Sequence, residues 1–153
     1  MYYIFLFLHS SIRWFVLASL LYALYIAGRG LLQKEPFSAH ANTVRQWTVT
    51  IAHLQLLVGM VVYIQGPFSF LHPFDGSYTI LSDQLFFRYI HVFMMILAVV
   101  LITIGSAKTK RIADSSQKYQ TMLCWFAVAL VVLLLAIPWP FSPLAQRPYL
   151  RTF

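Results

Sequence analysis

Apolar residues fill four long stretches of this chain, and short polar segments separate them. The stretches cover about residues 3–27, 44–65, 84–107 and 119–137. Each is close to the roughly 20 apolar residues that an α-helix needs to cross a hydrocarbon core of about 30 Å. Helices satisfy their backbone hydrogen bonds within one segment, as lipid requires. The pattern therefore predicts an all-α polytopic membrane protein, a single domain built as an antiparallel bundle of four transmembrane helices.

Glycine and proline mark the ends of three of these stretches. A Gly-Arg-Gly segment at 28–30 follows the first stretch, and Gly-Pro at 66–67 follows the second. The fourth is followed by Pro-Trp-Pro at 138–140, and two prolines so close together deny a helix its next amide donors. We expect the three helices to end at these signals.

Composition excludes most other classes of protein. Hydrophobic residues make up 60% of the 153 residues and charged residues only 10%, whereas a soluble domain usually carries about 25% charged residues. Intrinsic disorder and collagen-like structure are excluded on the same ground. Cys124 is the one cysteine, so a disulfide scaffold is excluded too. We expect the lipid bilayer to be the solvent of this chain.

The net charge of +7 would suggest a nucleic-acid partner in a soluble protein, but the positions of the basic residues favour a membrane interpretation. The first connection holds Arg29, Lys34 and Arg45, and the third holds Lys108, Lys110, Arg111 and Lys118. The second connection has only Arg88 against Asp75 and Asp83. Short loops rich in Lys and Arg mark the cytoplasmic side. We therefore expect no nucleic-acid partner and both termini on the outer face, although Arg147 and Arg151 in the tail oppose this orientation.

Five ionisable residues lie inside the predicted spans: His9, Arg13, His53, Arg88 and His91. Each costs about 2.5 to 3.5 kcal/mol at a helix centre, which makes such residues candidates for function. At 1.5 Å per residue, His9 and His91 both lie roughly 9 to 10 Å below the outer end of their helices. His53 enters from the inside and lies roughly 14 Å deep, near the middle of the bilayer.

Two histidines at one depth on different helices of a bundle are typical of a b-type haem site. Their ring nitrogens approach the iron from opposite faces. Arg13 follows His9 by four residues and Arg88 precedes His91 by three, so each arginine is expected on the helix face of its histidine. Haem propionates are anions, and guanidinium groups bind carboxylates. The residues therefore predict His9 and His91 as haem-iron ligands, with Arg13 and Arg88 toward the propionates.

Other interpretations of these residues stay open. An intramembrane histidine also serves as an interhelical hydrogen-bonding group, and an arginine near a helix end also snorkels to headgroup phosphates. His53, with Gln55 beside it, is a candidate alternative axial ligand, a candidate hydrogen-bond donor to a quinone, or a packing contact to another span.

Several chemistries lack the residues that they need. No Cys-x-x-Cys-His segment is present for a c-type haem. A di-iron or zinc site needs carboxylates or thiolates beside the histidines. The four acidic residues lie in or beside the predicted loops: Glu35, Asp75, Asp83 and Asp114. No catalytic residue is assigned.

Short motifs along nearly the whole chain resemble a known family. They are Leu8-His9-Ser10 with Arg13-Trp14, Leu54-Gln55-Leu56-Leu57 with Gly59 and Tyr63, Arg88-Tyr89-Ile90-His91 with Met94-Met95 and Ala98, Ile104-Gly105 before Ala107-Lys108, and Ile137-Pro138-Trp139-Pro140. Together they resemble the small four-helix membrane proteins of Bacteroidetes-type bacteria that are labelled cytochrome b. The resemblance implies a haem-associated protein of the bacterial inner membrane, in which His9 and His91 are the matching family histidines. The family pattern commonly has Pro where this chain has Val92, and a further histidine where it has Thr103.

We therefore expect a membrane b-type cytochrome that binds one haem b between His9 and His91 and exchanges single electrons with a quinone or a partner protein. Such a chain is an electron-transfer or accessory subunit rather than a free-standing enzyme, and it associates with respiratory-complex subunits or with itself. Two alternatives stay open. One is a cofactor-free structural or assembly subunit of a larger membrane complex, and the other is a bundle that binds a quinone or lipid at His53 and Gln55.

Overall fold

The computed structural model describes residues 1–71 and 83–141, and all the regular structure in these ranges is helical. The elements are α1 (Tyr2–Leu32), α2 (Ala39–Gln65), α3 (Asp83–Leu85), the π-helical turn η1 (Phe86–Ile90), α4 (His91–Arg111) and α5 (Ser115–Ala136). Four helices are long and apolar enough to cross a membrane: Tyr2–Leu32, Ala39–Gln65, Phe86–Arg111 and Ser115–Ala136. The predicted four-helix transmembrane bundle is confirmed, and the chain is a multi-pass membrane protein.

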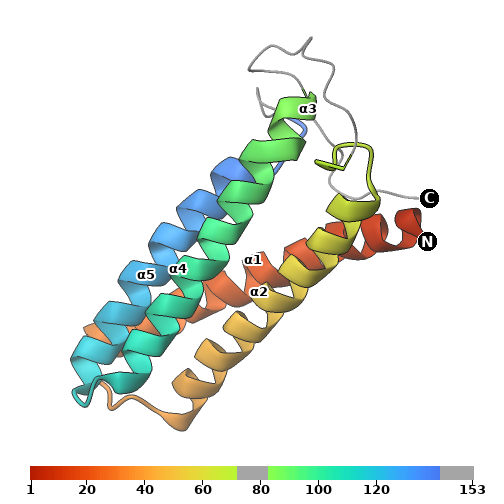
Figure 1. Ribbon diagram of the computed structural model, residues 1–153. Helices are drawn as coiled ribbons and strands as arrows, with labels where there is room; N and C mark the ends of the chain where they lie inside the picture. The colour runs from red at the N-terminus through yellow and green to blue at the C-terminus, as the bar shows by residue number, and fades with distance from the viewer. Residues whose placement is uncertain (72–82, 142–153) are drawn as a thin grey trace.

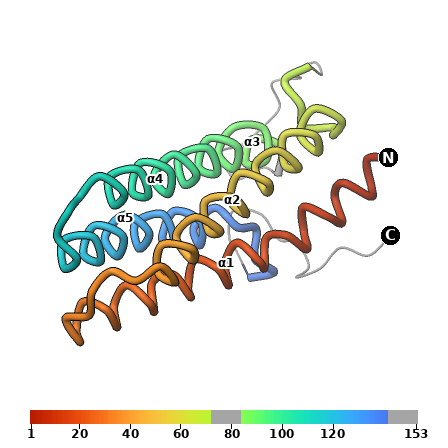
Figure 2. The backbone as a smooth tube through the Cα atoms, turned by 90° about the horizontal axis from the view of Figure 1, so that it is seen from below, coloured from red at the N-terminus to blue at the C-terminus, as the bar shows by residue number. Residues whose placement is uncertain are grey.

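The helices pack as two antiparallel pairs, α1 with α2 and α4 with α5 (Figure 1). Their connections, residues 33–38 and 112–114, lie at the same end of the bundle, which we call the connector end. The N-terminus of α1, the end of α2, η1 and the end of α5 lie at the opposite end (Figure 2). We call this opposite end the cavity end, for the reason given below.

The first helix does not end at the Gly-Arg-Gly segment, contrary to the expectation from the sequence. It continues to Leu32, and Lys34 then takes a φ of 52°, in the left-handed region. Gly30 lies directly against the ring of Tyr119 on α5, where a Cβ atom would overlap that ring. This glycine is therefore a point of close helix packing, and the packing outweighs the weak tendency of glycine to end a helix.

Small side chains form much of the bundle core. The alanines at 23, 27, 41, 52, 98 and 129 are buried, and Leu20, Ile102 and Phe126 fill the spaces between them. Long apolar side chains such as Phe15, Leu57 and Leu135 instead lie exposed on the outside of the bundle. Lipid is as apolar as these side chains, so close approach of small residues, rather than burial of large ones, holds such helices together.

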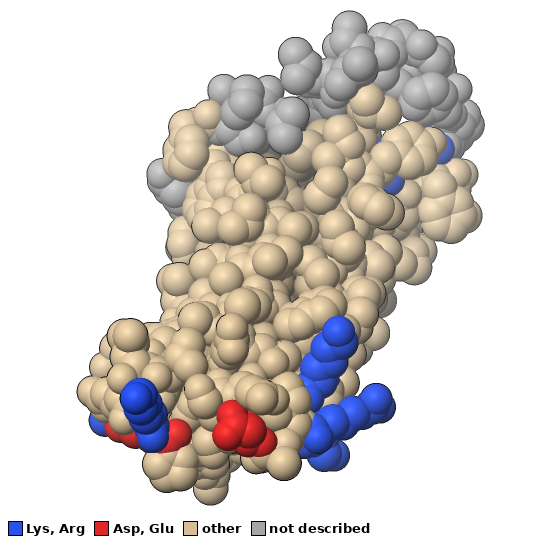
Figure 3. Space-filling model, turned by 90° about the vertical axis from the view of Figure 1, so that its left-hand side faces the viewer, with Lys and Arg blue, Asp and Glu red and all other residues tan. Residues whose placement is uncertain are grey.

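Charged side chains gather at the connector end of the face that Figure 3 shows, while most of its length is uncharged. Arg45 departs from this arrangement, because it is buried inside the bundle. Arg45 lies in α2 because this helix begins at Ala39, where Ser38 caps it by accepting a hydrogen bond from the Ala41 amide at 3.1 Å. Arg45 is only 4% exposed. The sequence interpretation counts Arg45 with the first connection, although the residue falls inside the second predicted stretch, 44–65.

Candidate functional site

A cavity of about 170 Å³ lies between the two helix pairs at the cavity end. Its lining runs from Tyr2 to Leu17 on α1 and from Ala52 to Tyr63 on α2, which corresponds to a length of about 20 Å along the helices. Residues of η1, α4 and the end of α5 complete it: Phe87, His91, Val92, Met95, Val99, Ile102, Leu133, Ile137 and Pro138. The surface of the cavity is mainly apolar, with a small set of polar groups in its outer half.

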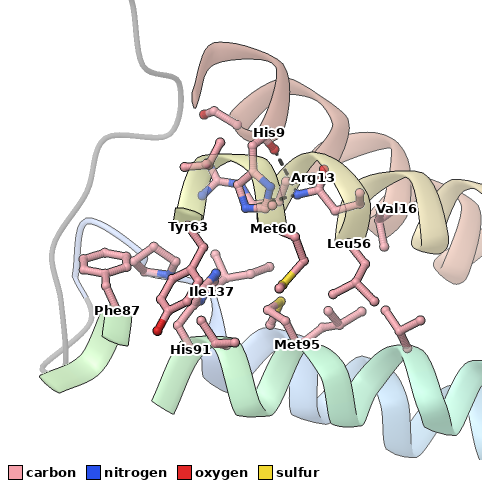
Figure 4. Close-up of a pocket in the computed structure, with 18 of the residues that line it drawn as sticks. His9, Arg13, Val16, Leu56, Met60, Tyr63, Phe87, His91, Met95 and Ile137 are labelled. Atoms are coloured by element: carbon pink, nitrogen blue, oxygen red, sulfur yellow. Dashed lines mark hydrogen bonds between the residues drawn. The ribbon is translucent and has the colours of Figure 1, made fainter. Parts of the chain in front are cut away.

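His9 of α1 and His91 of α4 meet across this cavity, as Figure 4 shows. Their ring centroids are 6.3 Å apart and the ring planes are inclined by 76°. Equal depth along the helices is the property that the sequence supplies for this pair. The structure adds that the two side chains point into the same space.

The hydrogen bond of His91 determines which of its ring nitrogens is accessible. His91 Nδ1 lies 2.8 Å from the carbonyl oxygen of Ala136 on α5. Because that oxygen only accepts, Nδ1 carries the proton and Nε2 keeps its lone pair. A backbone carbonyl behind one ring nitrogen is the usual way in which proteins orient a metal-binding histidine.

His9 is held by Gln55 of α2. The Gln55 amide nitrogen donates to the His9 carbonyl oxygen at 2.9 Å and lies 3.4 Å from His9 Nε2. Two buried atoms of this pair, His9 Nδ1 and Gln55 Oε1, have no hydrogen-bond partner in the described part of the chain. Unsatisfied buried polar atoms beside a cavity are costly, and they are typical of a site that binds a further group.

Gly59, one turn after Gln55, gives the His9 ring its space. A Cβ atom at Gly59 would lie 2.9 Å from Cε1 and 3.1 Å from Nδ1 of His9, which is closer than side chains tolerate. Gln55, Gly59 and Tyr63 follow one another at intervals of four and therefore share a helix face. This interval is a signal in the sequence that could have placed all three at one site. The pattern of ionisable residues alone does not include Gly59 or Tyr63.

The two arginines are not equivalent. Arg13 lines the cavity beside His9, and its guanidinium lies 5.5 Å from the ring centre of Trp14. Arg88 is buried outside the cavity lining and donates to the Phe70 carbonyl oxygen at 3.3 Å. The difference arises in η1, because a π-helical turn takes one residue more than an α-helical turn. Phe87 rather than Arg88 therefore shares the cavity face with His91.

His53 lies away from the cavity, although Gln55 lines it. His53 is exposed, its Nδ1 lies 2.8 Å from the Val49 carbonyl oxygen, and its Nε2 lies 3.4 Å from Oγ1 of Thr103 on α4. Two residues along an α-helix turn the side chain by about 200°, so His53 and Gln55 face different sides. The structure therefore does not bring these two residues together, and the residue beside His53 on α4 is Thr103.

The distance between the two imidazole centres is close to that of two rings bound to one metal ion, while the ring nitrogens of His9 lie beside Gln55 and Gly59. A metal–nitrogen bond is about 2.0 to 2.1 Å and each ring centre lies about 1 Å behind its nitrogen, so two rings on opposite sides of one ion have centres about 6 Å apart. The observed 6.3 Å agrees with this separation. No group of three or more His, Cys, Asp or Glu side chains in the described ranges forms a metal site.

Comparisons of this chain with protein-family models, with curated proteins and with solved structures find no match.

Proposed function

We propose that this protein is a membrane b-type cytochrome that binds one haem b between His9 and His91. The observation that carries the proposal is the 6.3 Å separation of the two imidazole rings, which line one cavity between the helix pairs. A bound haem would supply one-electron transfer at its iron. Its partner in that transfer would be a quinone or another protein, and the protein would act as an electron-transfer subunit.

The residues around the cavity have separate parts in this proposal. The Ala136 carbonyl orients His91, and Gln55 together with the space at Gly59 orients His9. Arg13 supplies a positive charge for a propionate. The apolar lining excludes water and keeps the local dielectric constant low. Arg88 is not part of this set, since its guanidinium is directed to the Phe70 carbonyl.

A haem between His9 and His91 would need space that side chains now fill between the two helix pairs. We therefore expect side chains at the cavity end to change position when haem binds. Long, flexible side chains such as Met60, Met95 and Arg13 line the cavity, and they can turn away more easily than branched or aromatic ones. The connector end, where the loops join the helices, would stay closed.

The charge distribution supports an orientation in the membrane. Arg29, Lys34, Lys108, Lys110 and Arg111 lie at or beside the connector end. We infer that this end faces the cytoplasm and that the N-terminus and the cavity face the outside of a bacterial inner membrane. The haem would then lie close to the outer leaflet, where it could exchange electrons with an external partner. The resemblance to the cytochrome b family supports the same assignment.

Haem titration of the purified protein in detergent tests the proposal. We expect the wild-type protein to bind one haem with a Soret band that shifts on reduction, and His9→Ala and His91→Ala each to weaken binding by more than about 100-fold, since each removes an iron ligand. His40→Ala is the matched control, because His40 lies at the connector end and contacts Tyr22 instead.

Circular dichroism and gel filtration of each variant establish that it is folded. A wild-type protein without a Soret band after haem addition would refute the proposal and favour a cofactor-free structural or assembly subunit. Unchanged haem affinity in folded His9→Ala and His91→Ala would also refute it, because the two histidines would then not be the ligands.

A further inference from the structure

The cavity contains two thioether groups that the proposed function does not use. Met60 of α2 and Met95 of α4 both line it. Figure 4 shows their sulfur atoms turned toward each other between the helix pairs, beside the two histidines. Three helices thus bring two imidazoles and two thioethers to one enclosed space.

This set of donors selects among metal ions. Thioethers are soft ligands that favour Cu(I), and imidazole suits copper as well. Carboxylates, which Mg²⁺, Ca²⁺ and Mn²⁺ require, and thiolates, which structural zinc sites favour, do not occur among the described lining residues. The chemistry of the cavity therefore favours copper in its reduced state.

The charge of the surroundings favours a monovalent ion. Imidazole and thioether ligands are neutral, and Arg13 adds a positive charge nearby. The cost of placing an ion in an apolar interior rises with the square of its charge. Cu(I) therefore avoids most of the penalty that Cu(II), Zn²⁺ or Fe²⁺ would meet in this cavity.

The geometry also suits a bare ion. The imidazole centres, at 6.3 Å, are close to the separation of two rings bound to one ion, so a rotation of the His9 ring would suffice to place both on it. His91 presents Nε2 because its Nδ1 is bonded to Ala136. A cavity of about 170 Å³ holds an ion without any movement of the helices.

We propose that His9, His91, Met60 and Met95 form a Cu(I)-binding site. The site shares its two histidines with the proposed haem site, so the two ligands exclude each other. It does not depend on haem binding, because the methionines and the spacing of the rings support it independently. The protein without haem would therefore hold one copper ion per chain.

Competition with the chromophoric chelator bicinchoninate, under anaerobic and reducing conditions, measures this binding. We expect the wild-type protein to withdraw one Cu(I) per chain from the chelator. The double variant Met60→Leu/Met95→Leu should bind Cu(I) at least about tenfold more weakly, since it removes both sulfurs. Leucine for methionine nearly conserves volume, so the fold should be retained. Met94→Leu is the matched control, because Met94 lies beside Met95 but outside the cavity lining.

X-ray absorption of the copper-loaded protein gives a second readout. We expect nitrogen and sulfur scatterers around copper in the wild type and no sulfur in the double variant. Haem titration and Cu(I) competition on the wild-type protein separate the two proposals. Copper binding without haem binding would support this site and refute the cytochrome, and the reverse result would refute this site alone. Equal copper affinity of the double variant and the wild type would also overturn it.

Discussion

Buried polar groups at the two ends of the bundle differ in their hydrogen bonding. At the connector end, Arg45 donates from Nη1 to the Ser106 carbonyl oxygen at 3.0 Å and to the Ser106 hydroxyl, and from Nη2 to Asn42 at 2.7 Å. Thr48 donates to backbone oxygens of α1 and α2. At the cavity end, His9 Nδ1 and Gln55 Oε1 are buried without partners in the described residues, next to open space.

The difference separates polar residues that join helices from polar residues that line a cavity in one membrane domain. Arg45 keeps only its Nε without a partner among the described residues. Its bonds to Ser106 join α2 to α4 and so connect the two helix pairs, while its bond to Asn42 lies within α2. The imidazoles at the cavity end do not join the helix pairs through bonds to each other. Both side chains line the cavity instead. Polar residues are buried at both ends, where they are costly in lipid. The two ends differ in the hydrogen-bond partners of these residues.

Removing the Arg45 side chain should have the largest effect on stability. Arg45→Ala deletes the bonds to Ser106 and Asn42 in a buried position. We expect a loss of about 2 to 4 kcal/mol in the free energy of unfolding. Denaturation in detergent micelles, followed by circular dichroism, measures it. An unchanged stability would show that Arg45 does not join the helix pairs.

Replacing Gly30, at the connector end, should cause the next largest loss of stability. Gly30→Ala places a methyl group against the buried ring of Tyr119 on α5. We expect a destabilisation of about 1 to 3 kcal/mol from overpacking, with haem affinity unchanged because the site lies at the other end. Parallel unfolding and haem titrations check both parts. A loss of haem affinity in a folded Gly30→Ala variant would contradict the separation of the two ends.

Gly59→Ala is the matched change at the cavity end. Its methyl group would lie 2.9 Å from His9 Cε1, so the His9 ring must move. We expect haem affinity to fall about tenfold, which corresponds to about 1.4 kcal/mol, because support of a ligand residue is usually worth 10- to 100-fold. The Soret titration measures this change. Gly28→Ala serves as the control, since a Cβ atom there would meet nothing within 4 Å.

Replacing His53 should cause the smallest change, a nearly unaltered haem affinity. His53→Ala removes an exposed side chain that contacts Thr103 and Val49, outside the cavity. Haem affinity should change less than about twofold, because second-sphere effects require contact with a ligand residue. A tenfold loss in the same titration would assign the iron ligand to His53 and contradict the pairing of His9 with His91.

Fold and site differ in how far the sequence predicts them. Length and hydropathy predict four spans because the bilayer thickness sets the length of a helix. The same pattern fails for the end of α1, because packing of Gly30 on Tyr119 extends the helix. The sequence pattern also places Arg88 on the same helix face as His91. The π-helical turn η1 has more residues per turn than an α-helix, so Arg88 lies on a different face. The sequence pattern counts Arg45 with the first connection. Its burial could not be predicted, because it depends on where α2 begins and on contact with Ser106 of α4.

The sequence by itself determines the number of helices, the end at which charge gathers, and the equal depth of His9 and His91, since these depend on composition and on a rise of 1.5 Å per residue. Only the tertiary structure decides that the two imidazoles face each other, that Gln55 and Gly59 position one of them, and that Met60 and Met95 join them. Hydropathy is nearly uniform around helices that lie in lipid. It therefore sets their depth in the membrane but not their rotation or their neighbours.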